Sequence, residues 1–173
     1  MHAPPPPTGQ LEAAMLRYQR PLLQYAASLT SSRETARDLV QDTFLRLANH
    51  GPVEEERLAS WLFTVCRNRA HDIRRKERRF MPPSHLPTEM ISPEPGPDLQ
   101  LQANELHARL LQLLTHLPES QREVVRLRFQ GGLSYKEIAE VTQLGVSHVG
   151  VLLHQALKRL RQLWQQTLEV DSL

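Results

Sequence analysis

Residues 134–161 read SYKEIAEVTQLGVSHVGVLLHQALKRLR and contain the strongest structural pattern of this 173-residue chain. Ser134 followed by Glu137 forms a capping box, which predicts the start of a short helix ending near Val141. After a break of about four residues, a longer helix is expected over roughly 147–166. A short helix, a tight break and a longer helix are typical of a helix-turn-helix, a common DNA-binding motif.

The longer helix divides into two faces. On a helical wheel its apolar face, which would hold it to its own domain, comprises Val149, Leu152, Leu153, Ala156, Leu157, Leu160, Leu163 and Trp164. The opposite face carries Ser147, Val151, His154, Lys158 and Gln162. The first turns of such a helix meet base edges, so the candidates for base contact are Ser147, His148, Val151 and His154. A plain helical hairpin that binds no DNA is the alternative that the pattern leaves open.

Glycines stand at two positions that affect this surface. Gly145 is the expected N-cap of the longer helix, where it supplies no side-chain acceptor. Gly150 lies in the first turns, where the missing side chain would let the backbone approach a groove closely. Val151 beside it offers an apolar contact to a thymine methyl group.

The composition permits one ordinary domain or two small ones. Hydrophobic residues make up 40% of the chain and aromatic residues only 5%, which favours two minimal cores. The formal net charge of +2 supports no argument from global charge. The single cysteine, Cys66, falls on the apolar side of its helix, so we expect a core residue and a reducing compartment.

The N-terminal half predicts three helices. Residues 11–29 are apolar at helical spacing, and Pro21 would kink this helix or start a new one. Ser31 and Glu34 form a further capping box, which predicts that the second helix starts there. The apolar face of that helix comprises Ala36, Leu39, Val40, Thr43, Phe44 and Leu47.

The third helix is expected from Trp61 to about Arg79, after a loop at residues 50–60. Its apolar stripe comprises Leu62, Val65, Cys66, Arg69 through its aliphatic stem, and Ile73. Its opposite face carries Thr64, Arg67, Asn68, His71 and Arg75. From residue 67 to residue 79, seven basic residues stand against two acidic ones. Such an excess indicates either a nucleic-acid-binding surface or a solvated helix end.

These patterns predict an all-α fold of two small helical domains. Between them, residues 81–98 contain six prolines and no helical periodicity, which is typical of a flexible linker. The expected organisation is a disordered tail, a first domain, the linker, a second domain with the helix-turn-helix, and a short tail. The corresponding ranges are 1–10, 11–80, 81–98, 99–166 and 167–173.

Three stretches resemble one known family. Residues 117–161, LPESQREVVRLRFQGGLSYKEIAEVTQLGVSHVGVLLHQALKRLR, resemble region 4 of the extracytoplasmic-function (ECF) sigma factors of bacterial RNA polymerase. Residues 34–47, ETARDLVQDTFLRL, are similar to their regions 2.1–2.2, and residues 60–79, SWLFTVCRNRAHDIRRKERR, to their regions 2.3–2.4. The resemblance covers about residues 11–80 and 99–163, in the family's order.

The resemblance implies three sets of site residues. Contacts to core polymerase would come from the polar face of the second helix, at Asp38, Gln41, Asp42 and Arg46. The minus-10 promoter element would be bound by Arg57, Trp61, Thr64, Arg67, Asn68, His71, Arg74 and Arg75, and residues 50–60 would hold an extruded base. The minus-35 element would be read by Arg122, Ser134, Tyr135, Lys136, Ser147, His148, Gly150, Val151, His154 and Lys158.

The resemblance also implies the partners: core RNA polymerase, promoter DNA and, as a further candidate, an anti-sigma factor. We expect a monomer when the protein is free, in the bacterial cytoplasm. No apolar run approaches the ~20 residues of a membrane span, which agrees with that location. No cofactor, metal or enzymatic activity is predicted, since the eight histidines are scattered and form no known metal-binding or catalytic motif. A stand-alone helix-turn-helix regulator is the main alternative, and it would leave the first domain unexplained.

Overall fold

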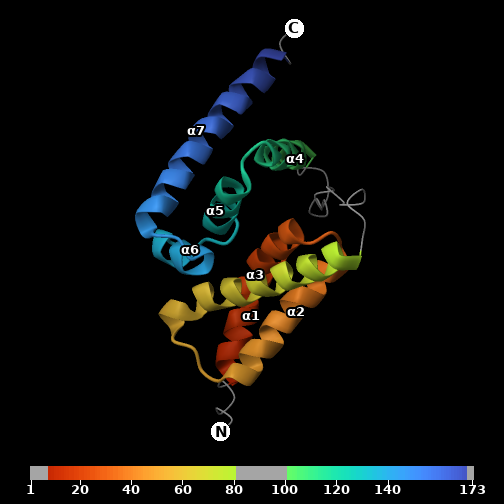
Figure 1. The fold of residues 1–173 in the computed structure, drawn as a ribbon, viewed down its shortest axis with the longest axis vertical. Helices are drawn as coiled ribbons and strands as arrows, with labels where there is room; N and C mark the ends of the chain where they lie inside the picture. The colour runs from red at the N-terminus through yellow and green to blue at the C-terminus, as the bar shows by residue number, and fades with distance from the viewer. Residues whose placement is uncertain (1–7, 81–100, 171–173) are drawn as a thin grey trace.

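The computed structural model describes residues 8–80 and 101–170, and this part of the chain is helical and contains no strand (Figure 1). The helices are α1 (Thr8–Leu29), α2 (Arg33–His50), α3 (Glu55–Phe80), α4 (Leu101–Thr115), α5 (Glu119–Phe129), α6 (Tyr135–Thr142) and α7 (Val146–Val170). The all-α prediction is confirmed. The proposed linker and most of the N-terminal tail lie outside the described residues, whereas residues 8–10 already belong to α1.

Helices α1, α2 and α3 form an N-terminal unit. Helix α1 continues through Pro21 as one helix. In α2, all six residues of the expected apolar face are buried. The cap of α2 is Ser32 and not Ser31: its backbone is extended, and its hydroxyl accepts a hydrogen bond of 3.0 Å from the Thr35 amide. Both serines lie just before the helix, and the one that takes the cap is the one whose oxygen reaches a free amide of the first turn.

Helix α3 starts at Glu55, earlier than predicted, so the expected loop at residues 50–60 is only residues 51–54. Glu55 and Glu56 occupy the first turn, where the positive end of the helix dipole favours acidic side chains. Glu55 and Glu56, which were expected to lie in the loop, therefore begin the helix. Cys66 is buried as expected, and burial raises the pKa of its thiol to about 12.

The short loop between α2 and α3 is held by the first turns of α1. Gln10 donates a hydrogen bond of 2.6 Å to the Val53 carbonyl and accepts one of 3.3 Å from the Val53 amide. Nearby, Arg17 pairs with Glu55 at 3.1 Å across exposed surface. Because one amide side chain satisfies both backbone groups of Val53, it defines the position of the loop.

The helix-turn-helix is present as predicted. Both reciprocal bonds of the Ser134–Glu137 capping box form at the start of α6. Gln143 ends that helix in the left-handed conformation, with φ 61° and ψ 30°. The break is therefore tight, and α7 begins again at Val146.

The apolar face of α7 is buried mainly in its first half. Val149, Leu152, Leu153 and Ala156 are buried, Leu160, Leu163 and Trp164 are half-buried, and Leu157 is 45% exposed. Helix α5, against which α7 packs, has 11 residues, whereas α7 has 25. The short partner therefore covers only part of the length of α7.

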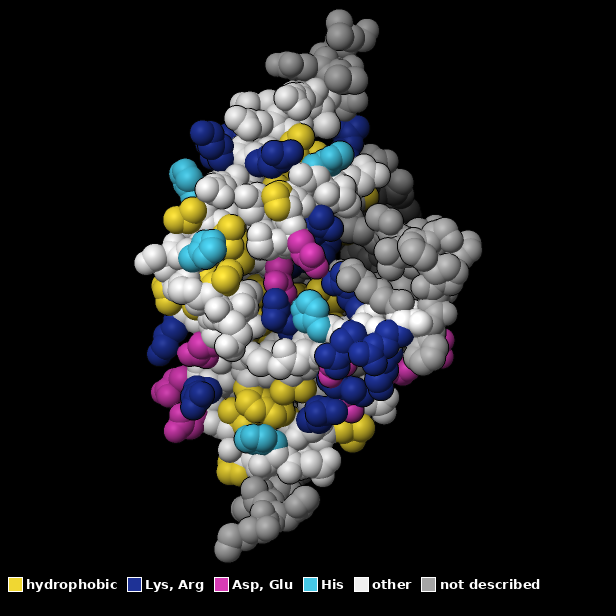
Figure 2. All heavy atoms as spheres, in the orientation of Figure 1, with side chains coloured by type: hydrophobic (Ala, Val, Ile, Leu, Met, Phe, Trp, Pro, Cys, Tyr) yellow, Lys and Arg dark blue, Asp and Glu magenta, His cyan; other side chains and the backbone are white. Residues whose placement is uncertain are grey.

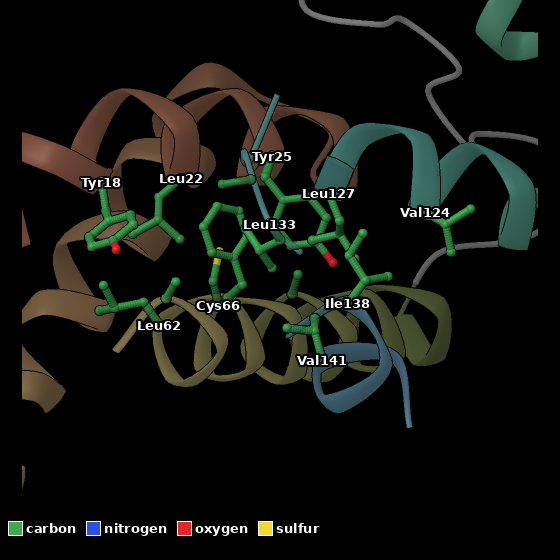
Figure 3. Packing of buried hydrophobic residues seen from close by; sticks show 14 of the residues in the cluster. Tyr18, Leu22, Tyr25, Leu62, Cys66, Val124, Leu127, Leu133, Ile138 and Val141 are labelled. Atoms are coloured by element: carbon green, nitrogen blue, oxygen red, sulfur yellow. The ribbon is translucent and has the colours of Figure 1, made fainter. Parts of the chain in front are cut away.

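The buried side chains of both halves form one continuous cluster and not the two separate cores expected from composition. Figure 3 shows residues of α1, α5 and α6 converging on α3. Phe63 and Ala70, outside the predicted apolar stripe of α3, are fully or almost fully buried. A Cβ placed on Gly131 would lie 3.1 Å from the Phe63 ring. Helix α3 is thus covered on two sides, by α1 and α2 and by the α5–α6 region.

We expect Ser32→Ala to lower the free energy of unfolding by about 1 kcal/mol, because the N-terminal cap of α2 is lost. Ser31→Ala is the matched control, since Ser31 does not take the capping bond, and its change should stay within about 0.5 kcal/mol. Urea denaturation followed by circular dichroism measures both. Equal losses in the two variants would show that the cap is assigned to the wrong serine.

We expect Gln10→Ala to accelerate hydrogen exchange at the Val53 amide several-fold, since hydrogen bonds worth about 1 kcal/mol each are removed from the loop. The helical amides of α2 should exchange at their original rate. Gln19→Ala, an exposed change on the same helix, provides the control. Unchanged exchange at Val53 would contradict the role of Gln10.

Candidate nucleic-acid interface

Helix α3 brings the predicted minus-10 residues to one side of the N-terminal unit. Arg57, Asn68, His71 and Arg75 are exposed, and Trp61, Thr64, Arg67 and Arg74 are half-buried. Figure 2 shows lysine and arginine side chains gathered on the side where α3 ends. Such a basic surface beside polar groups can track a nucleic-acid backbone.

Trp61 packs against the core and against His50 at the end of α2. The two rings meet edge to face, with 5.0 Å between centroids and 62° between planes. His50 directly precedes the 51–54 loop in the sequence, and Trp61 lies about two helical turns after it. The indole is therefore anchored, but only half-buried.

Arg67 contacts the C-terminal half of the chain. Its Nε and Nη2 donate to the Glu123 carboxylate at 2.7 and 3.2 Å. The Tyr25 hydroxyl of α1 donates to the same carboxylate at 2.9 Å. Burial by itself raises the pKa of Glu123, but the hydrogen bonds and charge of Arg67 outweigh it, so this pKa lies below its usual value. Burial and the neighbouring carboxylate raise the pKa of Tyr25.

Further charged groups surround this contact. Arg74 pairs with Glu119 of α5 at 3.2 Å, and Arg75 pairs with Asp72 on its own helix at 3.0 Å. Burial, and then the charge of Arg67, lower the pKa of His71, so its ring is mostly neutral at pH 7. The residues of the proposed minus-10 surface are thus partly engaged by α5.

The first turns of α7 present the predicted base-contacting residues to solvent. Ser147, His148, Val151 and His154 are exposed, as is Lys158 further along. Gly150 lies beside the ring of Tyr135, because a Cβ placed there would be 3.7 Å from it. The Arg128 guanidinium lies 5.7 Å from the centre of the same ring.

The other predicted minus-35 residues differ in exposure and in the hydrogen bonds that they already form. Ser134 is occupied as the cap of α6, and Lys136 is exposed beside it. Arg122 is half-buried, and its Nη2 donates to the carbonyl groups of Leu117 at 2.9 Å and Thr115 at 3.4 Å. Arg122 therefore holds the turn between α4 and α5.

The polar face of α2 is open to solvent at Asp38, Gln41 and Arg46. Asp42 accepts hydrogen bonds from Arg46 and from Arg69 of α3, both at 3.0 Å. Burial raises the pKa of Asp42, but the two arginines outweigh it and hold the pKa below its usual value. This face therefore presents an ordered array of mixed charge.

Sequence reasoning missed Tyr25, Glu123 and Gln10. One available signal was the spacing of Glu119, Glu123 and Arg126, which places three charges on one strip of α5. Arg126 is buried, and its Nη1 donates to the Ser28 carbonyl of α1 at 3.3 Å. The sequence indicates this strip of charges on α5, but it does not indicate that the strip contacts α1 and α3.

Residues 8–80 and 101–170 contain neither a metal-binding cluster nor a membrane-spanning helix. No group of three or more histidine, cysteine or acidic side chains in that part could hold a metal ion. No helix there has the length and apolar character needed to cross a membrane.

Both halves of the chain are similar in sequence to known proteins. Residues 14–80 match the family model for sigma-70 region 2, and residues 107–160 match the model for sigma-70 region 4. The ECF RNA polymerase sigma factor EcfG of Rhodopseudomonas palustris is 30% identical over 161 residues, which cover 91% of this chain and 87% of that protein.

Two solved structures have the same fold. The sigma factor RpoE of Bartonella quintana, solved in complex with the anti-sigma factor NepR, has a TM-score of 0.69 and 25% identity, covering 91% of this chain and 98% of that one. CnrH, solved with the cytosolic domain of CnrY, has a TM-score of 0.62 and 25% identity, covering 92% and 90%. With matches to both sigma-70 regions and to whole relatives, this chain belongs to the ECF RNA polymerase sigma factors, which are transcription initiation factors and not enzymes.

Proposed function

We propose that this sigma factor binds core RNA polymerase and places two DNA-binding surfaces on a promoter. The observation that carries the proposal is that one chain holds a basic helix, α3, and a helix-turn-helix with an exposed polar strip on α7. The 20 residues between α3 and α4 can extend to on the order of 65 Å. This reach exceeds one turn of duplex DNA, about 34 Å.

In the proposed role, α3 binds the separated strand of the minus-10 element. Arg67, Arg74 and Arg75 supply positive charge for phosphates, and Asn68 can form hydrogen bonds with base edges. An extruded base would lie against the 51–54 loop, which Gln10 holds in position.

The minus-35 element would be read by α7 in the major groove. His148 and Val151 would meet base edges, because they occupy the exposed first turns of the second helix. Lys136 and Lys158 would contact phosphates, which position the helix without specifying sequence.

Core polymerase would bind the polar face of α2. Asp38, Gln41 and Arg46 are exposed there and could pair with complementary charges. We propose an anti-sigma factor as a further partner, since both solved relatives were found with another chain and one of these is named an anti-sigma factor. The proposed location is the bacterial cytoplasm, where core polymerase works, with a monomer as the free form.

Reconstitution tests the proposal against the alternative of a stand-alone regulator. We expect the protein to co-purify with core polymerase and to direct transcription from start sites that share two upstream motifs. Core polymerase alone is the control. A protein that binds duplex DNA but neither binds core nor changes its start sites would be a stand-alone regulator.

Two variants of α7 separate base reading from phosphate binding. We expect His148→Ala to alter the preferred minus-35 sequence, with a loss of about 1–3 kcal/mol at the position it reads. Lys158→Ala should weaken binding to all sequences alike and reduce its salt dependence. Binding to a promoter library at constant salt measures both. An unchanged preference in His148→Ala would place the wrong face of α7 in the groove.

A further inference from the structure

Gln155 lies on the same strip of α7 as two residues proposed to meet base edges. His148, Val151 and Gln155 follow one another at spacings of three and four residues, which places them along one side of a helix. All three side chains are exposed. The strip therefore continues about one turn beyond Val151, past the residues that the sequence pattern indicated as base-contacting.

The Gln155 amide is held by a side chain of another helix. Nε2 of Gln121, in the first turn of α5, donates a hydrogen bond of 3.2 Å to Oε1 of Gln155. Gln121 is half-buried, whereas Gln155 is exposed. The bond joins residues 34 positions apart, across the packed pair of α5 and α7. The outer amide therefore has a preferred orientation before any partner binds.

The start of α5 is a fixed support for Gln121. The next residue, Arg122, donates to the carbonyl groups of Leu117 and Thr115 and so holds the turn before the helix. Val124, nearly one turn after Gln121, is fully buried. Because α5 is tied down on both sides of Gln121, its amide has a defined position relative to α7.

We propose that Gln155 reads an adenine of the minus-35 element and that Gln121 is the positioning residue for its amide. The inference rests on the proposed reading of that element by α7. It adds a base-reading residue to α7 and gives α5 a part in sequence preference, although Gln121 itself would not touch DNA.

The preference for adenine follows from the chemistry of the amide. In the major groove, a glutamine side chain can donate to N7 and accept from N6 of one adenine, and this pair of bonds distinguishes adenine from the other bases. An amide oxygen has two lone pairs, so Oε1 of Gln155 can accept from adenine while it still accepts from Gln121. Orientation by Gln121 also lowers the entropy cost of binding, because a long side chain is already ordered.

The spacing along α7 predicts where Gln155 reads. Seven positions separate it from His148, which corresponds to about 10 Å along a helix axis. Bases of one strand are about 3.4 Å apart, so the two side chains would meet bases about three steps apart. Homeodomain recognition helices read bases with residues spread over a similar length.

The experiment uses the full-length protein with core polymerase on a promoter library randomised across the upstream motif. Transcript counts for each sequence give the base preference at every position. The variants are Gln155→Ala, Gln121→Ala and the double variant. Gln165→Ala removes the same amide from an exposed position farther along α7 and is the matched control. His148→Ala, which should alter a different position, is the internal reference.

We expect Gln155→Ala to reduce the preference for adenine at one position at least about fivefold, since both hydrogen bonds to that base are lost. This position should lie about three bases from the one that His148→Ala alters. Gln121→Ala should weaken the same preference to a smaller extent, and its addition to Gln155→Ala should cause no further loss. Gln165→Ala should retain the wild-type preference. A general loss of stability would instead lower transcription from all sequences alike.

Two results would overturn the proposal while leaving the proposed function intact. In one, Gln155→Ala keeps the wild-type adenine preference although His148→Ala changes its own position, so that α7 reads DNA without Gln155. In the other, Gln121→Ala lowers the preference equally with and without Gln155, so that it does not act through that amide. A failure of the proposed function looks different, because the wild-type protein with core would then show no upstream base preference and His148→Ala would change nothing.

Discussion

Helix α3 is buried on two sides, and the rest of the structure is arranged around that constraint. On one side, Leu62 and Cys66 pack against α1 and α2 and close the N-terminal unit. On the other, α3 packs against α6, and Phe63 approaches the backbone at Gly131, between α5 and α6. An apolar strip on a second face is unfavourable in water, so the C-terminal half docks on this face.

Docking creates an electrostatic requirement on the same helix. Arg67 and Arg74 flank the second apolar strip, and a partly buried guanidinium needs an acceptor. Glu123 and Glu119 of α5 meet that need. Arg67 and Arg74 therefore form ion pairs that hold the two halves together, and they are also residues proposed to contact DNA.

Local patterns predicted much of the fold, because helical periodicity and caps depend on residues a few positions apart. The buried face of α2 and the capping box at Ser134 are examples. The predicted helix starts were wrong where the same local sequence is compatible with two structures. Neighbouring serines competed for the cap of α2, and Glu55 and Glu56, which are also compatible with a loop, begin α3. The exposed strip of α7 was predicted as well, because it follows from helical periodicity alone.

The sequence by itself determined an all-α chain with a helix-turn-helix, and the similarity of its motifs indicated the family. It did so because each motif is contiguous and each helix face repeats within a few turns. Only the tertiary structure decided that Glu123 meets Arg67 and Tyr25, and that Gln10 holds Val53. These partners lie 56, 98 and 43 residues apart in pairs. Nothing in the local sequence distinguishes a carboxylate that faces water from one that meets a distant guanidinium.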